Sequence, residues 1–428
     1  MSLVPVCGLL GDGLVPGGAA CQIQGAKGYI PMTDLPVLRL RPKSKPQAIR
    51  HGFPWVFADE AVLDRRSRAI PAGSFAVLED AERKPLALVT VNPNSKIVAR
   101  VMDPETRASI DGAWLRAKLA RALAMRERLY DTPFYRLVHA EADGLPGLVI
   151  DRFGDAAVVQ PNAAWADRMA GDLADALVDV TGVSTVILNG QGRARGLEGL
   201  DERMEVLRGQ APGQPIPVPM NGATYLADLM GGQKTGLFFD QRPNHAFAQR
   251  LARGATVLDV FSHVGGFGLA GLAAGAAHAT CVDGSAAALD LAKGGAGRMD
   301  AADRLDTIQS DAFKAMEQLA AEGRRFDVVV CDPPAFAPSK PALEAGLRAY
   351  ERVAKMAAPL VAPGGYLGLC SCSHAADLTA FRNVSARGIG RGGRRGVLIH
   401  TGQAGPDHPM LPQLAETGYL KALFFRLD

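Results

Sequence analysis

The hydrophobic positions in the second half of the chain follow two alternating patterns. After Pro217, short apolar runs such as "TVLDVF" and "FDVVVCDPP" are separated by longer stretches with helical spacing. Strands that alternate with helices in this way are typical of a parallel sheet with helices on both faces. We therefore predict an α/β domain over residues 217–428.

The pattern divides the first half into two smaller regions. Residues 32–105 contain short strand-like segments between turn residues, which predicts a small β-barrel. In residues 106–216, the amphipathic helix "GAWLRAKLARALAMRERLY" precedes strands around "DGLPG" and "RFGD", which predicts a compact central α/β domain. The basic side chains of that helix are interpreted as a solvated face: Arg116, Lys118, Arg121, Arg126 and Arg128.

Composition adds expectations about the N-terminus and the compartment. Residues 1–31 are rich in glycine, proline and alanine and have little periodicity, so we expect a disordered extension. They lack the basic start and compact apolar block of a secretory signal, and no apolar run reaches the length of a membrane span. None of the six cysteines forms a C-x-x-C pair. Their scatter fits reduced thiols, so we expect a cytoplasmic protein without membrane contact.

The distribution of charge suggests contact with a nucleic acid at one basic segment, and not over the whole chain. The net charge of the 428 residues is +3, so a polyanion would have to be bound by a patch rather than by bulk charge. One such patch lies in "LRLRPKSKPQAIRHG", with Arg39, Arg41, Lys43, Lys45 and Arg50. A solvated basic edge and a contact with an RNA backbone both remain open for it.

Chemistry-bearing residues follow the strands of the predicted C-terminal sheet. They are Asp259, Asp283, Asp311, Asp332 and Cys372, each at the end of a successive apolar run. Ligands of parallel sheets bind beyond the carboxyl ends of the strands. We therefore expect these five side chains to line one edge.

The glycine-rich turn after the first of these strands favours a cationic cofactor. "VFSHVGGFG" lacks the G-x-G-x-x-G spacing that seats a diphosphate, and Asp259 places a carboxylate there. S-adenosylmethionine carries an ammonium and a sulfonium and no phosphate, so it suits this turn, where Gly265 and Gly266 allow close backbone approach. Asp283 is expected to bind the ribose hydroxyls and Asp311 the adenine amino group. Each aspartate has a helix N-cap as its alternative role.

The candidate cofactor-binding residues also include two serines beside these turns, Ser262 and Ser285, and Asp332. Asp332 opens "DPPAF", where two prolines make a rigid elbow. Such a loop can hold a flat base, so Pro333, Pro334 and Phe336 are the candidate substrate-binding residues. A plain proline-stiffened turn is the alternative.

Cys370 and Cys372 could be core residues, metal ligands or a nucleophile. A metal would need further ligands, and only His374 lies nearby, so we predict no metal site. Cys370 lies deeper in its strand and is interpreted as packing. Cys372 lies at the strand end beside Asp332, which favours a catalytic role.

A thiolate at this place has a defined chemical use. Carbon 5 of cytosine is a poor nucleophile, but addition of a thiolate at carbon 6 makes an enamine that can attack a methyl-sulfonium. Asp332 would protonate N3 and stabilise the adduct. The sequence does not identify the base that removes the proton from carbon 5.

These motifs resemble one known family. "QKTGLFFDQR", "VFSHVGGFG", "VVCDPPAF", "SCSH", "DHP" and "YLKALFF" occur in the order found in PUA-containing class I methyltransferases that form 5-methylcytosine in large-subunit (23S) ribosomal RNA. "HGFPWVFADE" resembles the start of that family's PUA domain, and "ADGLPGLVIDRFGD" resembles its central domain. Two positions depart from the family, Ala335 in place of lysine and His263 in place of tyrosine.

The resemblance implies an N-terminal PUA-like RNA-binding domain, a central α/β domain and a Rossmann-like methyltransferase domain. It implies that Cys372 is the catalytic cysteine and that ribosomal RNA is the partner. It also implies that residues 234–242 cover the cofactor, so Lys234, Thr235, Asp240 and Arg242 join the candidate cofactor-binding residues.

Other functions stay open at this point. An RNA N-methyltransferase would use D-P-P to hold an exocyclic amine, and a catalytically inactive RNA-binding protein would retain the fold alone. An NAD-linked enzyme is disfavoured by the missing phosphate loop. The oligomeric state is also open, with a homodimer as one alternative.

Overall fold

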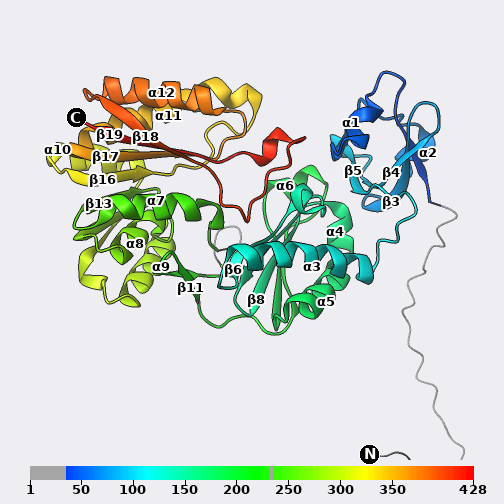
Figure 1. Cartoon of the computed structure of the whole chain (residues 1–428), viewed down its shortest axis with the longest axis horizontal. Helices are drawn as coiled ribbons and strands as arrows, with labels where there is room; N and C mark the ends of the chain where they lie inside the picture. The colour runs from blue at the N-terminus through cyan, green and yellow to red at the C-terminus, as the bar shows by residue number, and fades with distance from the viewer. Residues whose placement is uncertain (1–34, 232–235) are drawn as a thin grey trace, which may run out of the picture. The chain divides into compact units, whose positions relative to one another are not determined.

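The computed structural model describes residues 35–231 and 236–428 (Figure 1). The extension expected at residues 1–31 and the candidates Lys234 and Thr235 lie outside the described residues. Within the described ranges, no helix combines the length and the apolarity that a membrane crossing requires.

The N-terminal strands form a mixed five-stranded sheet. In spatial order they are β1 (Val37–Arg39), β3 (Ser74–Glu79), β4 (Pro85–Val91), β5 (Ile97–Asp103) and β2 (Trp55–Phe57), with the short helices α1 (Pro46–Arg50) and α2 (Arg65–Arg68) outside them. Just beyond the two edge strands, Leu40 and Ala61 form an antiparallel bridge, and the Arg41 N–H donates to the carbonyl of Glu60. These bonds bring the two edges together, as expected for a small barrel.

The middle of the chain forms a second five-stranded sheet. Its spatial order is β10 (Arg203–Arg208), β9 (Thr185–Gly190), β8 (Ala156–Pro161), β7 (Leu148–Phe153) and β6 (Phe134–His139), and only β8 and β9 pair in parallel. The helices of this region are α3 (Gly112–Leu129), α4 (Ala164–Arg168), α5 (Ala170–Thr181) and α6 (Arg193–Leu197), with the 3₁₀ turn η2 at Ala140–Asp143. Leu115, Leu119 and Trp165 are fully buried in its core.

One basic residue of α3 corrects the prediction of a solvated face. Arg126 is completely buried, and its guanidinium lies 2.6 and 2.8 Å from the two carboxylate oxygens of Asp143. It also donates to the main-chain carbonyl of Asp407. The helical pattern alone could not show this, because both partners come from other segments of the chain.

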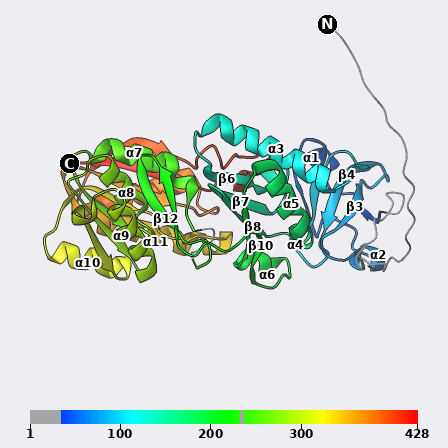
Figure 2. The ribbon, with the colours of Figure 1, turned by 90° about the horizontal axis from the view of Figure 1, so that it is seen from below.

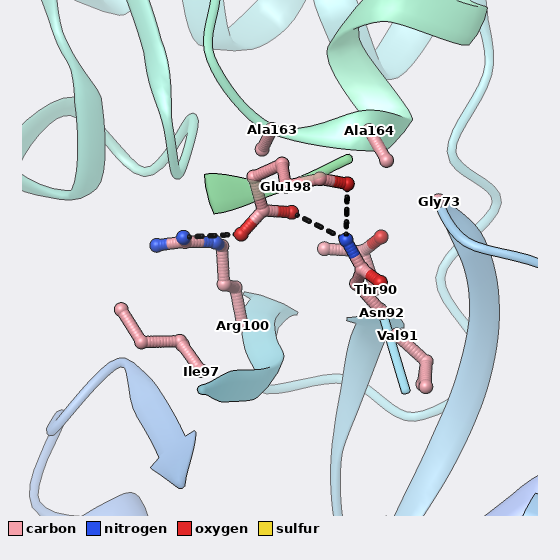
Figure 3. A pocket seen from close by; sticks show the side chains of 9 residues that line it. All are labelled: Gly73, Thr90, Val91, Asn92, Ile97, Arg100, Ala163, Ala164 and Glu198. Carbon is pink, nitrogen blue, oxygen red and sulfur yellow. Dashed lines mark hydrogen bonds and ion pairs between the residues drawn. The ribbon is translucent and has the colours of Figure 1, made fainter. Parts of the chain in front are cut away.

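Glu198 connects the first two sheets. Its carboxylate accepts from Arg100 and Asn92 of the N-terminal region, each at 2.9 Å (Figure 3). It also accepts from the hydroxyl of Ser95 at 2.9 Å. The enclosed space beside these side chains is about 10 Å³, which holds at most one water molecule. This buried polar contact is therefore a connection between regions and not a binding site.

The C-terminal sheet has seven strands. Their spatial order is β15 (Leu305–Gln309), β14 (His278–Asp283), β13 (Thr256–Val260), β16 (Phe326–Cys331), β17 (Val361–Ser371), β19 (Lys421–Leu427) and β18 (Gly396–Gly402). The first five run parallel, and β19 is antiparallel to both of its neighbours. The predicted parallel α/β domain is confirmed.

Helices cover both faces of this sheet, as Figure 1 shows. One face packs against α7 (Arg242–Ala252), α8 (Gly266–Ala273) and α9 (Ala286–Gly297), and the other against α10 (Ala312–Ala321), α11 (Leu343–Ala357) and α12 (Leu378–Arg391). Neighbouring strand residues such as Val257 and Leu258 enter opposite cores, because successive side chains of a strand alternate between its faces. The hairpin of β11 (Ile216–Met220) and β12 (Ala223–Ala227) packs on α8 and α9 (Figure 2).

Candidate active site

The parallel strands bring the predicted residues to one edge of the sheet. Asp259 is the penultimate residue of β13, and Asp283 is the last residue of β14. Asp332 and Cys372 follow directly after β16 and β17, and Asp311 lies two residues beyond β15. Because these strands pair in parallel, their carboxyl ends share the edge at which ligands bind.

Asp259 holds the glycine-rich turn in place. Its Oδ2 accepts from the main-chain N–H groups of Phe267 and Gly268, at 2.9 and 2.8 Å, in the first turn of α8. Its Oδ1 is buried and has no hydrogen-bond partner among the described residues. Burial raises the pKa of Asp259 to about 7. A cation beside Oδ1 would satisfy this oxygen, so the residue suits the ammonium of S-adenosylmethionine.

The turn has an unusual backbone. Phe261, His263 and Gly265 have φ angles of 63°, 49° and 81°, in the left-handed region. Only glycine adopts this region without cost, so the two other residues carry backbone strain of the kind that clusters at ligand-binding turns. Gly265 is the N-cap of α8, and Gly266 begins that helix, where a β-carbon would lie 2.9 Å from Nε2 of the buried His245. A side chain at Gly266 would therefore displace His245, and the neighbouring Ser262 is buried.

Asp283 joins two turns at the same edge. Its Oδ2 accepts from the N–H of His263 at 2.8 Å, and its Oδ1 accepts from the N–H of Ser285 at 2.9 Å. Ser285 in turn caps α9 by accepting from the N–H of Ala288. A carboxylate oxygen has two lone pairs, so these contacts leave capacity for ribose hydroxyls.

Asp311 shows the contacts of a helix cap. It is exposed, and its Oδ1 accepts from the N–H groups of Phe313 and Lys314 at the start of α10. Asp311 is therefore the N-cap of α10, the alternative role that the sequence suggested. A contact with adenine through the second oxygen stays a prediction.

Asp332 is oriented by a residue that the sequence did not single out. The side-chain amide of Gln241, buried in the 3₁₀ turn η3 (Phe239–Gln241), donates to its Oδ2 at 2.8 Å. The Gln241 carbonyl accepts from Asn244, which fixes the orientation of the amide. The signal was present in "FFDQR", but a glutamine in a turn does not indicate its partner.

The two prolines differ in exposure, and Phe336 lies among other rings. Pro333 is buried and Pro334 is exposed, so the second proline is the one at the surface. Phe336 is half-buried, with its ring centre 5.0 Å from that of Tyr350 and 6.5 Å from that of Phe313. Contact of these three residues with a base stays a prediction.

Cys372 differs from the other described cysteines. Cys281, Cys331 and Cys370 are buried, whereas Cys372 is partly exposed. Burial holds the pKa of Cys370 well above its usual range, which fits its interpretation as packing. The described residues contain no group of ligands that could hold a metal ion.

Ser373 fastens the cysteine segment to the D-P-P loop. Its buried hydroxyl accepts from the N–H of Ala337 at 2.9 Å and lies 2.7 Å from the Tyr350 hydroxyl. The loops that follow β16 and β17 therefore have a direct connection. Asp332 and Cys372 are held on two segments that cannot separate without breaking it.

The remaining candidates lie on the segment before α7. Asp240 is nearly buried, and its Oδ2 accepts from the Tyr419 hydroxyl at 2.6 Å. The Arg242 guanidinium stacks on Tyr130, 4.0 Å from its ring centre, and donates to the carbonyl of Phe134. The described contacts of the Arg242 guanidinium are thus with the central region and with the ring of Phe239, 5.5 Å from its centre. The cofactor roles of Asp240 and Arg242 stay predictions.

Comparisons with known proteins show to which family the chain belongs. Residues 189–426 match the family described as S-adenosylmethionine-dependent methyltransferase, and residues 38–104 match the PUA-like domain family. A ribosomal RNA large subunit methyltransferase from Deinococcus radiodurans is 34% identical over 411 residues, 93% of this chain and 99% of that protein. Ribosomal RNA large subunit methyltransferase I of Pseudoalteromonas translucida is 32% identical over 387 residues, 89% of this chain and 97% of that protein.

Solved structures show the same fold. A Streptococcus mutans protein described as a SAM-dependent methyltransferase matches with a TM-score of 0.76 at 17% identity, covering 92% of this chain and all of that one. A methyltransferase structure complexed with SAH matches with a TM-score of 0.77, also at 17% identity, covering 91% of this chain and 99% of that one. Sequence and fold agree, and the chain belongs to the family of S-adenosylmethionine-dependent methyltransferases, with a PUA-like domain at its N-terminal side.

Proposed function

We propose that this methyltransferase forms 5-methylcytosine in large-subunit ribosomal RNA through a covalent bond to Cys372. The observation that carries the proposal is the connection from Ala337 through Ser373, which holds Asp332 and the one partly exposed described cysteine at the same sheet edge. The names of the relatives support a ribosomal RNA substrate.

This geometry supports the following role for each residue in the proposed reaction. S-adenosylmethionine supplies an electrophilic methyl group when bound. The Cys372 thiolate adds to carbon 6 of the cytosine, while Asp332 holds a proton at N3, and the electron pair reaches carbon 5, which takes the methyl group. Loss of the proton from carbon 5 then expels the thiolate and restores the aromatic ring.

The cofactor would be held by the strand-end residues. Asp259 would hold the ammonium with its unsatisfied oxygen, and Asp283 would bind the ribose hydroxyls. The two turns beside them are formed with Ser262, Gly265, Gly266 and Ser285. Asp311 would reach the adenine. Asp240 and Arg242, with Lys234 and Thr235 outside the described residues, would close the methionine end.

The PUA-like region would bind RNA through its basic loop. Residues 41–45, together with Asp59 and Glu60, line a surface depression. Arg39 and Arg50 are already paired with Glu79 and Asp80, whereas Lys43 and Lys45 are exposed and form no ion pair within the described part of the chain. The two lysines are therefore able to contact phosphates, as is the exposed Arg41, whose Nε donates to the carbonyl of Ala61. A homodimer and a cytoplasmic location also stay predictions.

One experiment separates the covalent route from N-methylation. A transcript that contains 5-fluorocytidine should trap the wild-type enzyme as a cross-linked species. A base can remove hydrogen from carbon 5 as a proton but cannot remove fluorine, so the bond to the cysteine persists. Cys372→Ala should give no adduct and no 5-methylcytosine, while Cys370→Ala should retain both. Full turnover by Cys372→Ala, with the methyl group on nitrogen, would overturn the proposal. An absence of any S-adenosylmethionine binding in calorimetry would instead indicate an inactive RNA-binding protein.

A further inference from the structure

Lys421 is a buried cation in a strand whose other buried residues are apolar. It is the first residue of β19, is only 8% exposed, and pairs with Ser371 of β17, one residue before Cys372. The sequence "YLKALFF" shows it among hydrophobic residues. Burying an ammonium costs free energy unless the group is hydrogen-bonded and its positive charge is compensated by a negative group nearby.

The hydrogen bonds of Lys421 are made to the cysteine segment. Its Nζ donates to the main-chain carbonyl of Ser373 at 2.6 Å and to that of Ala376 at 2.7 Å. Both bonds close the segment that starts with Cys372 around the ammonium. Two carbonyl oxygens satisfy two of its three donors but do not neutralise its charge.

No carboxylate compensates that charge directly. Among the residues that the structure describes, no ion pair within 4.0 Å involves Lys421. The groups that interact with it electrostatically are Cys372 and, on the same segment, Asp377 and His374. Cys372 in turn interacts with Tyr350 of α11 and with Tyr419, both hydroxyls whose pKa is raised by burial. The anions on this segment that the cation can stabilise are therefore a thiolate at Cys372 and the carboxylate of Asp377.

We infer that Lys421 is a positioning residue that holds the Cys372 segment by its two carbonyls and stabilises the thiolate of Cys372 by its charge. A cation beside a thiol increases the thiolate fraction at neutral pH. Burial lowers the pKa of Lys421 to about 8, and the interaction with Cys372 opposes this shift. The lysine is therefore mostly protonated at pH 7, when the thiolate is needed. The inference rests on the proposed function only in taking Cys372 as the nucleophile.

Alkylation of the full-length protein by iodoacetamide tests this without RNA or cofactor. The rate of modification of the Cys372 peptide, followed by mass spectrometry from pH 5.5 to 10, reports its thiolate fraction. In Lys421→Met the midpoint should rise by about one pH unit or more, which is a tenfold loss of thiolate at pH 7. Lys421→Arg should stay near the wild type, and so should the control Lys355→Met, at an exposed lysine of α11. An unchanged midpoint in a folded Lys421→Met protein overturns the inference.

A reciprocal measurement covers the case in which Lys421→Met does not fold. Two groups that interact shift each other by the same free energy. Cys372→Ser removes the thiolate, so the pKa of Lys421, followed by NMR of side-chain-labelled lysine and assigned with Lys421→Arg, should fall. An unchanged Lys421 pKa would overturn the inference. Because neither readout uses turnover, both are independent of the Cys372→Ala methylation result that tests the proposed function.

Discussion

The side-chain amide of Gln241 donates a hydrogen bond of 2.8 Å to the carboxylate of Asp332, and this bond connects the segment before α7 to the D-P-P loop. It fixes the direction of the carboxylate that the proposed reaction uses at N3 of the base.

Gln241→Leu should reduce turnover about tenfold to a hundredfold, because a hydrogen bond to a charged group contributes about 1.5–3 kcal/mol. Binding of S-adenosylmethionine should change little, so calorimetry and single-turnover methylation together check the prediction. Gln249→Leu is the matched control, since among the described residues that amide donates to the main-chain carbonyls of Asn221 and Ala270 and not to a carboxylate. Equal losses of turnover in the two variants would contradict a role for the Asp332 contact.

S-adenosylmethionine affinity should depend on pH through Asp259. Its raised pKa of about 7 means that the carboxyl gains a proton as the pH falls through this value. A cation prefers the ionised form, so affinity should increase from pH 6 to pH 8, by at most about tenfold per pH unit. Calorimetry across this range measures it. Asp259→Asn should bind weakly at every pH, and a variant that keeps the wild-type slope would assign the titration to another group.

Arg126→Met should destabilise the fold by about 3–5 kcal/mol, because it leaves the Asp143 carboxylate without its bidentate partner in a buried place. Chemical denaturation compares the variant with wild type. Arg121→Met, at an exposed position of the same helix, should change the free energy of unfolding by less than about 0.5 kcal/mol. A similar small change in Arg126→Met would show that the ion pair does not stabilise the protein.

Replacing Lys43 and Lys45 by glutamine should weaken RNA binding and flatten its salt dependence. Each lost phosphate contact should reduce the slope of log affinity against log salt by about 0.7–0.9. Filter binding at several salt concentrations measures the slope, and methylation at saturating RNA should be nearly unchanged. Lys84→Gln, in the exposed turn between β3 and β4, is the control. An unaltered slope would exclude the basic loop from the RNA interface.

The succession of strands and helices along the C-terminal half, and the place of the polar strand ends, could be predicted from the sequence. Asp259, Asp283 and Asp332 stand at the ends of apolar runs, and parallel strands must bring such ends to one edge. The deeper burial of Cys370 than of Cys372 could be predicted in the same way, since depth in a strand is a local property. These predictions depend on short segments and on a periodicity that neighbouring residues share.

The tertiary structure alone decided which partners these residues have. Gln241 and Asp332 are 91 residues apart, and Lys421 and Ser373 are 48 residues apart, so no local pattern relates them. Arg126 looked like one of several solvated arginines, yet the segment around Asp407 and the turn at Asp143 bury it. A hydropathy pattern predicts whether a residue is buried from its type and its spacing along the chain, and it does not identify the partners of that residue. A buried charge is held by specific partners, and only the folded chain brings those partners together.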